Sequence, residues 1–194
     1  GNGKVRAVGL AMAMQGSAIA GVDVASVSIK VNDDGFYSMT IGASDMGTGC
    51  DTTLAQVAAE CLECSVDDIV VYGTDTDISP YDSGSYASST AYLTGMAVVK
   101  TCESLKKKIL AKGAQYLGCR EEEVLFDGRR VYRPDVDGTG EWEISLKDIG
   151  NRAMCSNEDA LSACESHFSP VSPPPFMAGA AEVEVDLETG AVSL

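Results

Sequence analysis

Along the chain, short segments of alternating hydrophobic and polar residues are separated by turn sequences. The clearest pair, 24–31 and 36–41, is rich in β-branched and aromatic residues and flanks the turn Asn32-Asp33-Asp34-Gly35. An Asp-Gly step between two such runs is a strong signal for a β-hairpin. Asp127-Gly128 and Glu188-Thr189-Gly190 separate two further pairs. We therefore expect three antiparallel hairpins, formed by 24–31 with 36–41, 124–126 with 129–132, and 181–187 with 191–194, and additional strands at 5–13 and 69–72.

Helical periodicity marks three other segments. After Gly49, apolar residues recur at the i, i+3, i+4 and i+7 spacing of a half-buried helix, at Leu54, Val57, Ala58 and Cys61. A longer helix is expected from about Ser89 to Leu110 or slightly beyond, with the buried stripe Ala91, Gly95, Val98, Cys102, Leu105 and Ile109. Residues 145–154 form a third expected helix, and 65–68 a helical turn capped by Ser65.

The order of these elements indicates the fold class. Strands come mainly as antiparallel hairpins with helices between them, which favours an α+β fold over a doubly wound one. We expect a mixed sheet built from antiparallel hairpins with helices packed on it. A chain of 194 residues suffices for one substantial core or for two small lobes that share an interface. Two lobes would divide at about residue 115, with hairpins, a short helix and the proline-rich segment 169–175 in the second part, about 116–194.

Charge and composition narrow the functional classes. The formal net charge of −15 disfavours a nucleic-acid partner, because that affinity depends on Lys and Arg neutralising phosphates. Apolar residues make up 45% of the chain, but no apolar run approaches the roughly 20 residues that a membrane span needs. No secretory signal is visible. The chain begins at Gly1 and ends at Leu194 within an expected strand, so we expect a fragment of a longer polypeptide.

Cysteine and histidine usage argues against a metal site and against histidine-based catalysis. The seven cysteines form no repeated framework, and Cys61-x-x-Cys64 has no second ligand pair, so no zinc site is expected. We expect a reduced, cytoplasmic protein. His167 is the only histidine and lies in a region without a clear secondary-structure pattern. The chain also lacks the motifs of P-loop NTPases, zinc proteases and serine hydrolases, which leaves a self-contained hydrolase poorly supported.

The first candidate binding loop is Gly47-Thr48-Gly49, which precedes a helix start. Glycines let the backbone approach a ligand closely, and the exposed N–H groups and dipole of a first helical turn attract an anion, typically a phosphate. The alternative is that the glycines serve only to turn the chain. Asp45 and Asp51 favour that alternative, because they add negative charge beside the supposed anion site.

A second candidate loop precedes the next helix. Five of the seven residues from Gly84 to Thr90 carry hydroxyl groups, and they follow a long polar loop, 73–85. One hydroxyl suffices to cap a helix, and long loops in compact domains tend to be functional. The alternative is an ordinary capped helix start. Two such helix starts in one small domain lead to the hypothesis of one shared anionic ligand.

Taken in order, these segments resemble the molybdopterin-binding region of the molybdenum hydroxylases, the xanthine dehydrogenase and aldehyde oxidase family. Residues 45–60 are similar to the family's glycine loop, usually Gly-Gln-Gly, and to the Gln-(Ile/Val)-Ala-Ala-Glu stretch that follows it. Residues 75–90 are similar to its second cofactor loop, which 95–98 continue as a helix. Residues 182–190 and 15–18 are similar to a later strand-turn and to the opening of the region. The order and spacing of these segments make the resemblance specific.

The resemblance implies that the chain holds part of a molybdopterin or molybdopterin cytosine dinucleotide cofactor with its molybdenum. The implied contacts are Gly47, Thr48 and Gly49 on one side and, on another, Tyr86, Ala87, Ser88, Ser89 and Thr90. It further implies oxidation of a heteroaromatic or aldehyde substrate with water as the oxygen source. The implied partners are the rest of the large subunit and the chains or domains that carry iron–sulfur clusters and FAD.

Three departures limit what the resemblance implies. Thr48 stands where the family usually has Gln, so one amide contact is lost or replaced by a hydroxyl. The family's catalytic glutamate lies beyond the third hairpin, and the upstream half of the large subunit is absent, so no catalytic residue is expected here. We therefore expect the isolated chain to be inactive, to bind no cofactor by itself and to self-associate. The alternative is a non-catalytic binding or assembly domain that kept the fold without the cofactor.

Overall fold

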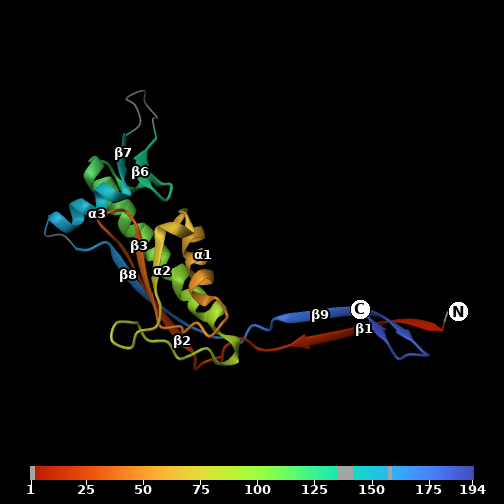
Figure 1. Ribbon diagram of the computed structural model, residues 1–194. Coiled ribbons are helices and arrows are strands. Elements are labelled where there is room, and N and C mark those ends of the chain that lie inside the picture. Colours follow the sequence, from red (N-terminus) through yellow and green to blue (C-terminus); the bar gives the residue numbers. More distant parts are fainter. Residues whose placement is uncertain (1–2, 135–141, 157–158) are drawn as a thin grey trace.

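A mixed four-stranded sheet forms the body of the molecule (Figure 1). The computed structural model describes residues 3–134, 142–156 and 159–194. β2 (Val24–Val31) lies between β3 (Tyr37–Ile41) and β8 (Ser162–Phe168) and is antiparallel to both, while β4 (Ile69–Tyr72) pairs parallel with β3. The first predicted hairpin and the α+β class with a mixed sheet are thereby confirmed.

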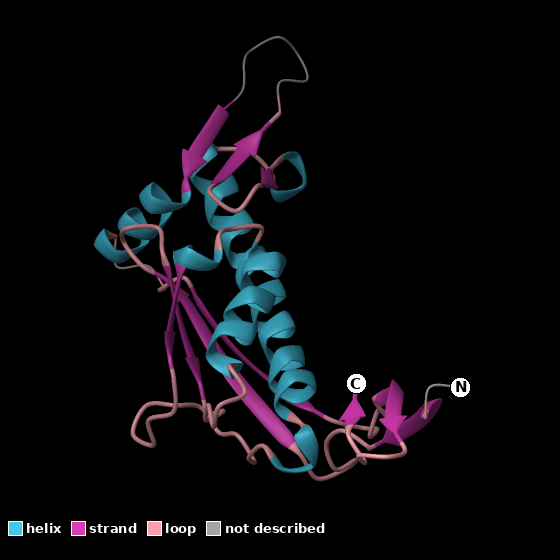
Figure 2. Ribbon diagram, turned by 45° about the vertical axis from the view of Figure 1, so that its right-hand side comes forward, coloured by secondary structure: helices cyan, strands magenta, loops and turns pink. Residues whose placement is uncertain are grey.

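Two helices, α1 (Cys50–Leu62) and α2 (Thr90–Leu117), cover one face of this sheet (Figure 2). β2 alternates accordingly: Val27 and Ile29 are fully buried beneath the helices, whereas Ser28 and Lys30 point to the other face. The predicted stripe of α2 is buried from Gly95 to Ile109. Its first member, Ala91, is exposed, so that part of the prediction is wrong.

A smaller antiparallel sheet packs at the far end of α2. It consists of β5 (Leu125–Phe126), β6 (Arg130–Arg133) and β7 (Trp142–Ser145), and it leads directly into α3 (Leu146–Cys155). The Ser145 hydroxyl accepts from the Asp148 N–H and so caps α3, the third helix that the sequence predicts. Gly128, with φ of 87°, turns the β5–β6 hairpin so close to the Glu63 carbonyl that no side chain fits there. The division into two lobes at about residue 115 stays a prediction.

A long two-stranded ribbon extends away from the body (Figure 1). β1 (Lys4–Met14) pairs antiparallel with β9 (Phe176–Asp186) over its whole length, and β10 (Val192–Ser193) closes the third predicted hairpin against the end of β9. β9 begins five residues before the predicted strand. Short 3₁₀ turns complete the elements at Val66–Asp68, Tyr86–Ser88 and Glu121–Glu123, the first of them capped by Ser65 as predicted.

The sequence prediction missed β8. The placement of His167 in a region without regular secondary structure is therefore wrong. This histidine lies in β8 opposite Ala25 and is only 8% exposed. Its ring meets the edge of the Tyr92 ring at a centroid distance of 5.8 Å, and burial, with a smaller contribution from Lys100, lowers its pKa. The imidazole is therefore neutral at pH 7 and acts as a packing group. Among the described residues, no helix is both long and apolar enough to cross a membrane.

Candidate functional site

A pocket of about 290 Å³ lies where the first turns of α1 and α2 approach each other. Both helix starts that the sequence singles out contribute to it, although they are some 40 residues apart in the chain. Its lining mixes five hydroxyl groups with apolar side chains and a thiol: Met46, Thr48, Cys50, Thr53, Leu54, Ser85, Ser88, Thr90 and Ala91. Ala91 is exposed because it faces this pocket rather than the sheet.

The glycine loop is held by an internal carboxylate. Asp45 Oδ1 accepts hydrogen bonds from the N–H groups of Gly47 at 2.8 Å and Gly49 at 3.1 Å. These backbone N–H groups hold the pKa of Asp45 below its ordinary value. Gly47 and Gly49 have φ of 101° and 71°, in the region that favours glycine. Two amides that the sequence leaves free for a ligand therefore already bind an anionic group of the chain.

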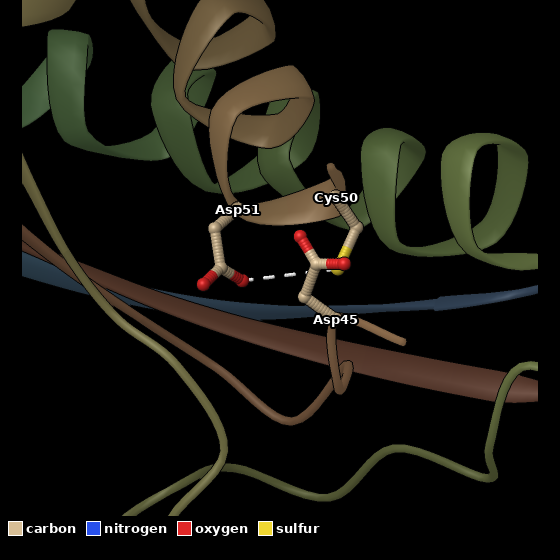
Figure 3. Close-up of side chains that lie close together, drawn as sticks. All are labelled: Asp45, Cys50 and Asp51. Carbon is tan, nitrogen blue, oxygen red and sulfur yellow. Dashed lines mark hydrogen bonds between the residues drawn. The ribbon is translucent and has the colours of Figure 1, made fainter. Parts of the chain in front are cut away.

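Figure 3 shows the three polar side chains at this helix start, Asp45, Cys50 and Asp51. One carboxylate oxygen of each aspartate and the Cys50 sulfur lie within 4.8 Å of one another. The Cys50 thiol donates to Asp51 Oδ1 at 3.7 Å. Burial, followed by the charges of Asp51 and Asp45, raises the pKa of the Cys50 thiol. The raised pKa keeps the thiol protonated at neutral pH, so the cluster consists of two carboxylates and a neutral thiol.

The second loop holds two residues in the left-handed region. Ala87 and Ser88 have φ of 54° and 52°, a conformation that costs non-glycine residues of order 1–3 kcal/mol each. The Ser89 hydroxyl donates to the Gly84 carbonyl at 3.2 Å, and the Thr90 hydroxyl donates to Ser85 Oγ at 2.7 Å. These hydroxyls therefore maintain the shape of the loop, and the strain concentrates beside the pocket.

A segment near the N-terminus of the chain contacts this loop and holds its shape. The Ala18 N–H donates to the Ala87 carbonyl at 3.0 Å, and the Gln15 side-chain amide donates to Ser88 Oγ at 3.2 Å. Both contacts come from residues 15–18, the segment that resembles the opening of the family's cofactor region. The two strained residues are thus fixed from outside their own loop.

Neither helix is capped by the side chain of its own N-cap residue, although Asp45 binds the Gly49 N–H at the start of α1. Gly49 at the start of α1 has no side chain to offer, and Ser89 at the start of α2 makes no capping hydrogen bond with its hydroxyl. The alternative of an ordinary capped helix start is therefore wrong for α2. First-turn N–H groups without an intrahelical partner need another acceptor, such as water or a ligand. The two dipoles also converge, since both first turns line one pocket.

Only some of the site residues expected from the sequence line the pocket. Thr48, Ser88 and Thr90 line the pocket directly. Gly47 and Gly49 shape the first loop, whereas Tyr86, Ala87 and Ser89 belong to the second loop without lining the pocket: Tyr86 is 47% exposed and Ser89 is buried. Sequence reasoning did not select Thr53 and Leu54, although their spacing of i+3 and i+4 from the lining residue Cys50 places them on the same helix face.

The fold is an α+β module in which the first turns of α1 and α2 open on one hydroxyl-lined cavity. Residues 1–194 match the family model described as a molybdopterin cofactor-binding domain. The chain therefore belongs to the molybdopterin cofactor-binding domain family, and the resemblance found in the sequence is confirmed.

Sequence similarity to curated relatives supports the same family. A probable hypoxanthine oxidase of Escherichia coli is 35% identical over 187 residues, which cover 96% of this chain and 19% of that protein. A putative xanthine dehydrogenase molybdenum-binding subunit of Escherichia coli is 33% identical over 171 residues, which cover 86% of this chain and 22% of that protein. The chain thus spans about a fifth of the length of these curated relatives.

Solved structures show the same fold. A crystal structure of the Cu,Mo-CO dehydrogenase superposes with a TM-score of 0.82 at 23% identity, covering 98% of this chain and 25% of that one. The aldehyde oxidoreductase from Desulfovibrio desulfuricans superposes with a TM-score of 0.65 at 20% identity, covering 98% of this chain and 19% of that one. At these identities the likeness concerns the fold alone, and it confirms the predicted molybdenum-cofactor-domain type.

Proposed function

We propose that this chain forms part of the molybdenum-cofactor cradle in the large subunit of a molybdenum hydroxylase of the xanthine dehydrogenase and aldehyde oxidase type. The observation that carries the proposal is the convergence of two helix starts, neither capped by its own N-cap side chain, on one pocket of about 290 Å³. A helix start that lacks a side-chain cap is a ready site for a phosphate, and two of them act on the same space.

The residues around the pocket fit the molybdopterin group in chemistry. Thr48 and Ser88 offer hydroxyls that can donate to phosphate or pterin oxygens, and Met46 and Leu54 offer apolar surface to a flat ring. A Cβ at Gly47 or Gly49 would meet nothing within 4 Å, so the outer side of this loop faces open space. The pterin phosphate would lie against the first turns of α1 and α2.

When bound, the cofactor supplies a two-electron oxidation in which water provides the oxygen added to a heteroaromatic or aldehyde substrate. The residues of this chain bind and orient the cofactor: hydroxyls and first-turn amides hold its polar atoms, and the strained residue Ser88 presents one such hydroxyl. We assign no catalytic residue to the chain, and the isolated chain is expected to be inactive. Its partners in this proposal are the rest of the large subunit and the iron–sulfur and flavin components of a cytoplasmic enzyme.

A second candidate function rests on Asp45. Its carboxylate occupies the N–H groups of Gly47 and Gly49, and Asp51 places a second negative charge at the same helix start. A domain that had lost its anionic cofactor would tolerate such carboxylates well, because no phosphate would be repelled. This feature favours a non-catalytic binding or assembly domain that keeps the fold.

Adjacent threonines in the first turn of α1 provide a matched test. Both are exposed, but Thr53 lines the pocket and Thr52 does not. In the full-length subunit, Thr53→Phe should fill the pocket and remove most of the molybdenum and pterin, measured per polypeptide. Thr52→Phe should leave both at the parent level. Equal cofactor content in the two variants, with both folded, would favour the non-catalytic alternative.

A further inference from the structure

The ribbon of β1 and β9 exposes large apolar side chains on one face. The register pairs Leu10 with Ala180, Met12 with Ala178 and Met14 with Phe176, so these residues share a face, which we call the large-residue face. Leu10 is 80% exposed, Met12 81% and Phe176 70%. Soluble proteins rarely leave such a contiguous set of large apolar side chains in water.

The opposite face of the ribbon is apolar as well but flat. It carries only small or β-branched residues and one methionine, and we call it the small-residue face: Val5, Ala7, Gly9, Ala11, Ala13, Met177, Gly179, Ala181, Val183 and Val185. Strands that are apolar on both faces are typical of sheets covered on both sides. A two-stranded ribbon by itself is at best marginally stable in water.

Two glycines in the small-residue face point to the close approach of another backbone. Gly9 and Gly179 lie near the middle of their strands, diagonal to each other across the register pair of Gly179 with Ala11. Neither has a positive φ, and a Cβ built on either meets nothing within 4 Å. Within the described residues, therefore, neither backbone conformation nor packing requires glycine there. Glycine weakens a strand interior and often marks a place where another backbone packs closely.

The ribbon also has unpaired edges. In its sheet β1 is an edge strand, and β10 pairs only with Val185 and Glu184 at one end of β9. Long unpaired apolar edges invite pairing with another strand. The segment that covers the ribbon must therefore contact both faces, and it can extend the ladder.

We propose that this ribbon is a docking surface for the rest of the same large-subunit polypeptide. This polypeptide covers the small-residue face along the ribbon and the large-residue face over its inner half, residues 10–14 and 176–180. The inference rests on the proposed function, because it takes the chain to be part of a longer large subunit. The chain spans 19% of one relative and 22% of another, so about four fifths of such a subunit is available to cover the ribbon. A second copy is the less favourable occupant, because each copy carries a formal charge of −15 and a tethered segment acts at a higher effective concentration.

Charge predicts where the covering ends on the large-residue face. In the outer half of that face, Glu184 accepts from Lys4 Nζ at 2.7 Å and from Arg6 Nε at 2.9 Å, and Glu182 lies beside them. Exposed ion pairs of this kind are stable in water and costly to bury. The covering of the large-residue face therefore stops between Leu10 and Glu182, whereas the small-residue face is covered along the ribbon.

Cysteine accessibility in the full-length subunit tests this boundary. Leu10→Cys and Ala11→Cys probe the two faces, and Glu182→Cys is the matched control on the charged part of the same ribbon. Each variant is labelled with a maleimide under native and urea-unfolded conditions, and labelling of the ribbon peptide is followed by mass spectrometry. We expect native labelling at the first two positions to be at least about tenfold slower than in urea, independent of protein concentration, and labelling of Glu182→Cys to be nearly as fast as in urea.

Two results would overturn the inference. One is native labelling of Leu10→Cys and Ala11→Cys at the urea rate, which would show a bare ribbon. The other is protection that disappears on dilution, which would identify a second copy as the occupant. Molybdenum and pterin are measured on the same samples. A protected ribbon in a subunit without cofactor would refute the proposed function and leave the docking inference standing, while a bare ribbon in a loaded subunit would do the reverse.

Discussion

Gly42 couples the sheet to the pocket, and its replacement by alanine is the most informative single change in the fold. Gly42 directly follows β3, and a Cβ there would lie 2.5 Å from the Pro80 carbonyl oxygen and 2.7 Å from Asp82 Cβ. The loop residues Pro80 and Asp82 pack against Gly42. Between them, the Tyr81 carbonyl accepts from the Ser26 N–H of β2 at 2.9 Å. This loop then leads directly into the second candidate binding loop.

The magnitude follows from the required displacement. Ordinary van der Waals contact begins near 3.4 Å, so the backbone at Pro80 must retreat by about 0.9 Å from the new methyl group. Overpacking of this kind costs about 1–3 kcal/mol, and a weakened Ser26–Tyr81 hydrogen bond adds about 1 kcal/mol. Asp82 moves with the loop, and its Oδ1 holds the Gly84 N–H at 2.8 Å. The change therefore disturbs the entrance to the pocket as well.

Thermal unfolding measures the effect. For a chain of this size 1 kcal/mol corresponds to about 2–4 °C, so Gly42→Ala should lower Tm by about 5–15 °C. Gly95→Ala is the matched control, because a Cβ at this position inside α2 meets nothing within 4 Å and alanine is the better helix former. It should keep or raise Tm. Equal Tm values for Gly42→Ala and the parent, or equal losses in both variants, would refute the close-approach argument.

Four further outcomes are expected. Gln15→Leu removes the donor to Ser88 Oγ and should speed cofactor release from the full-length subunit several-fold, measured by pterin fluorescence; an unchanged rate would contradict this role. The pKa of Asp45 is lowered in the folded state, so its stabilisation is present above the ordinary value of 3.8 and is lost as the pH falls through the lowered value. In urea titrations the gap to Asp45→Ala should be constant above about pH 5 and close below it; a gap independent of pH would contradict the assignment. Alkylation followed by mass spectrometry should modify Cys155 faster than Cys50, whose thiol is buried and has a raised pKa. The isolated chain should self-associate through its apolar ribbon in sedimentation experiments. A monomer at high protein concentration would contradict this role of the ribbon.

Most elements of the fold could be predicted because their sequences carry strong local signals. The first hairpin has β-branched strands around an Asp-Gly turn, and α2 has a sustained apolar stripe. β8 could not be predicted in this way, because Ser-Ala-Cys-Glu-Ser-His-Phe has no β-branched residue and owes its strand form to pairing with β2. The first half of β9, with its Ala and Gly residues, is set in the same way by pairing with β1.

The candidate site was predictable in outline but not in its electrostatics. Hydroxyl content and glycine spacing indicated both loops, and the family resemblance linked them. The role of Asp45 was missed, although an Asp followed by glycine two and four residues later is typical of a carboxylate that binds its own backbone N–H groups. The left-handed Ala87 and Ser88 carried no such signal, because tertiary contacts from Ala18 and Gln15 hold them.

The central claim is that both helix starts face one anionic cofactor, and a density map of the full-length subunit with its cofactor bound tests it most directly. We predict pterin or phosphate density in the pocket between α1 and α2, within about 2.7–3.2 Å of first-turn amides and of the hydroxyl of Thr48 or Ser88. A map in which another segment of the subunit fills this pocket, with the pterin bound elsewhere, would contradict the account.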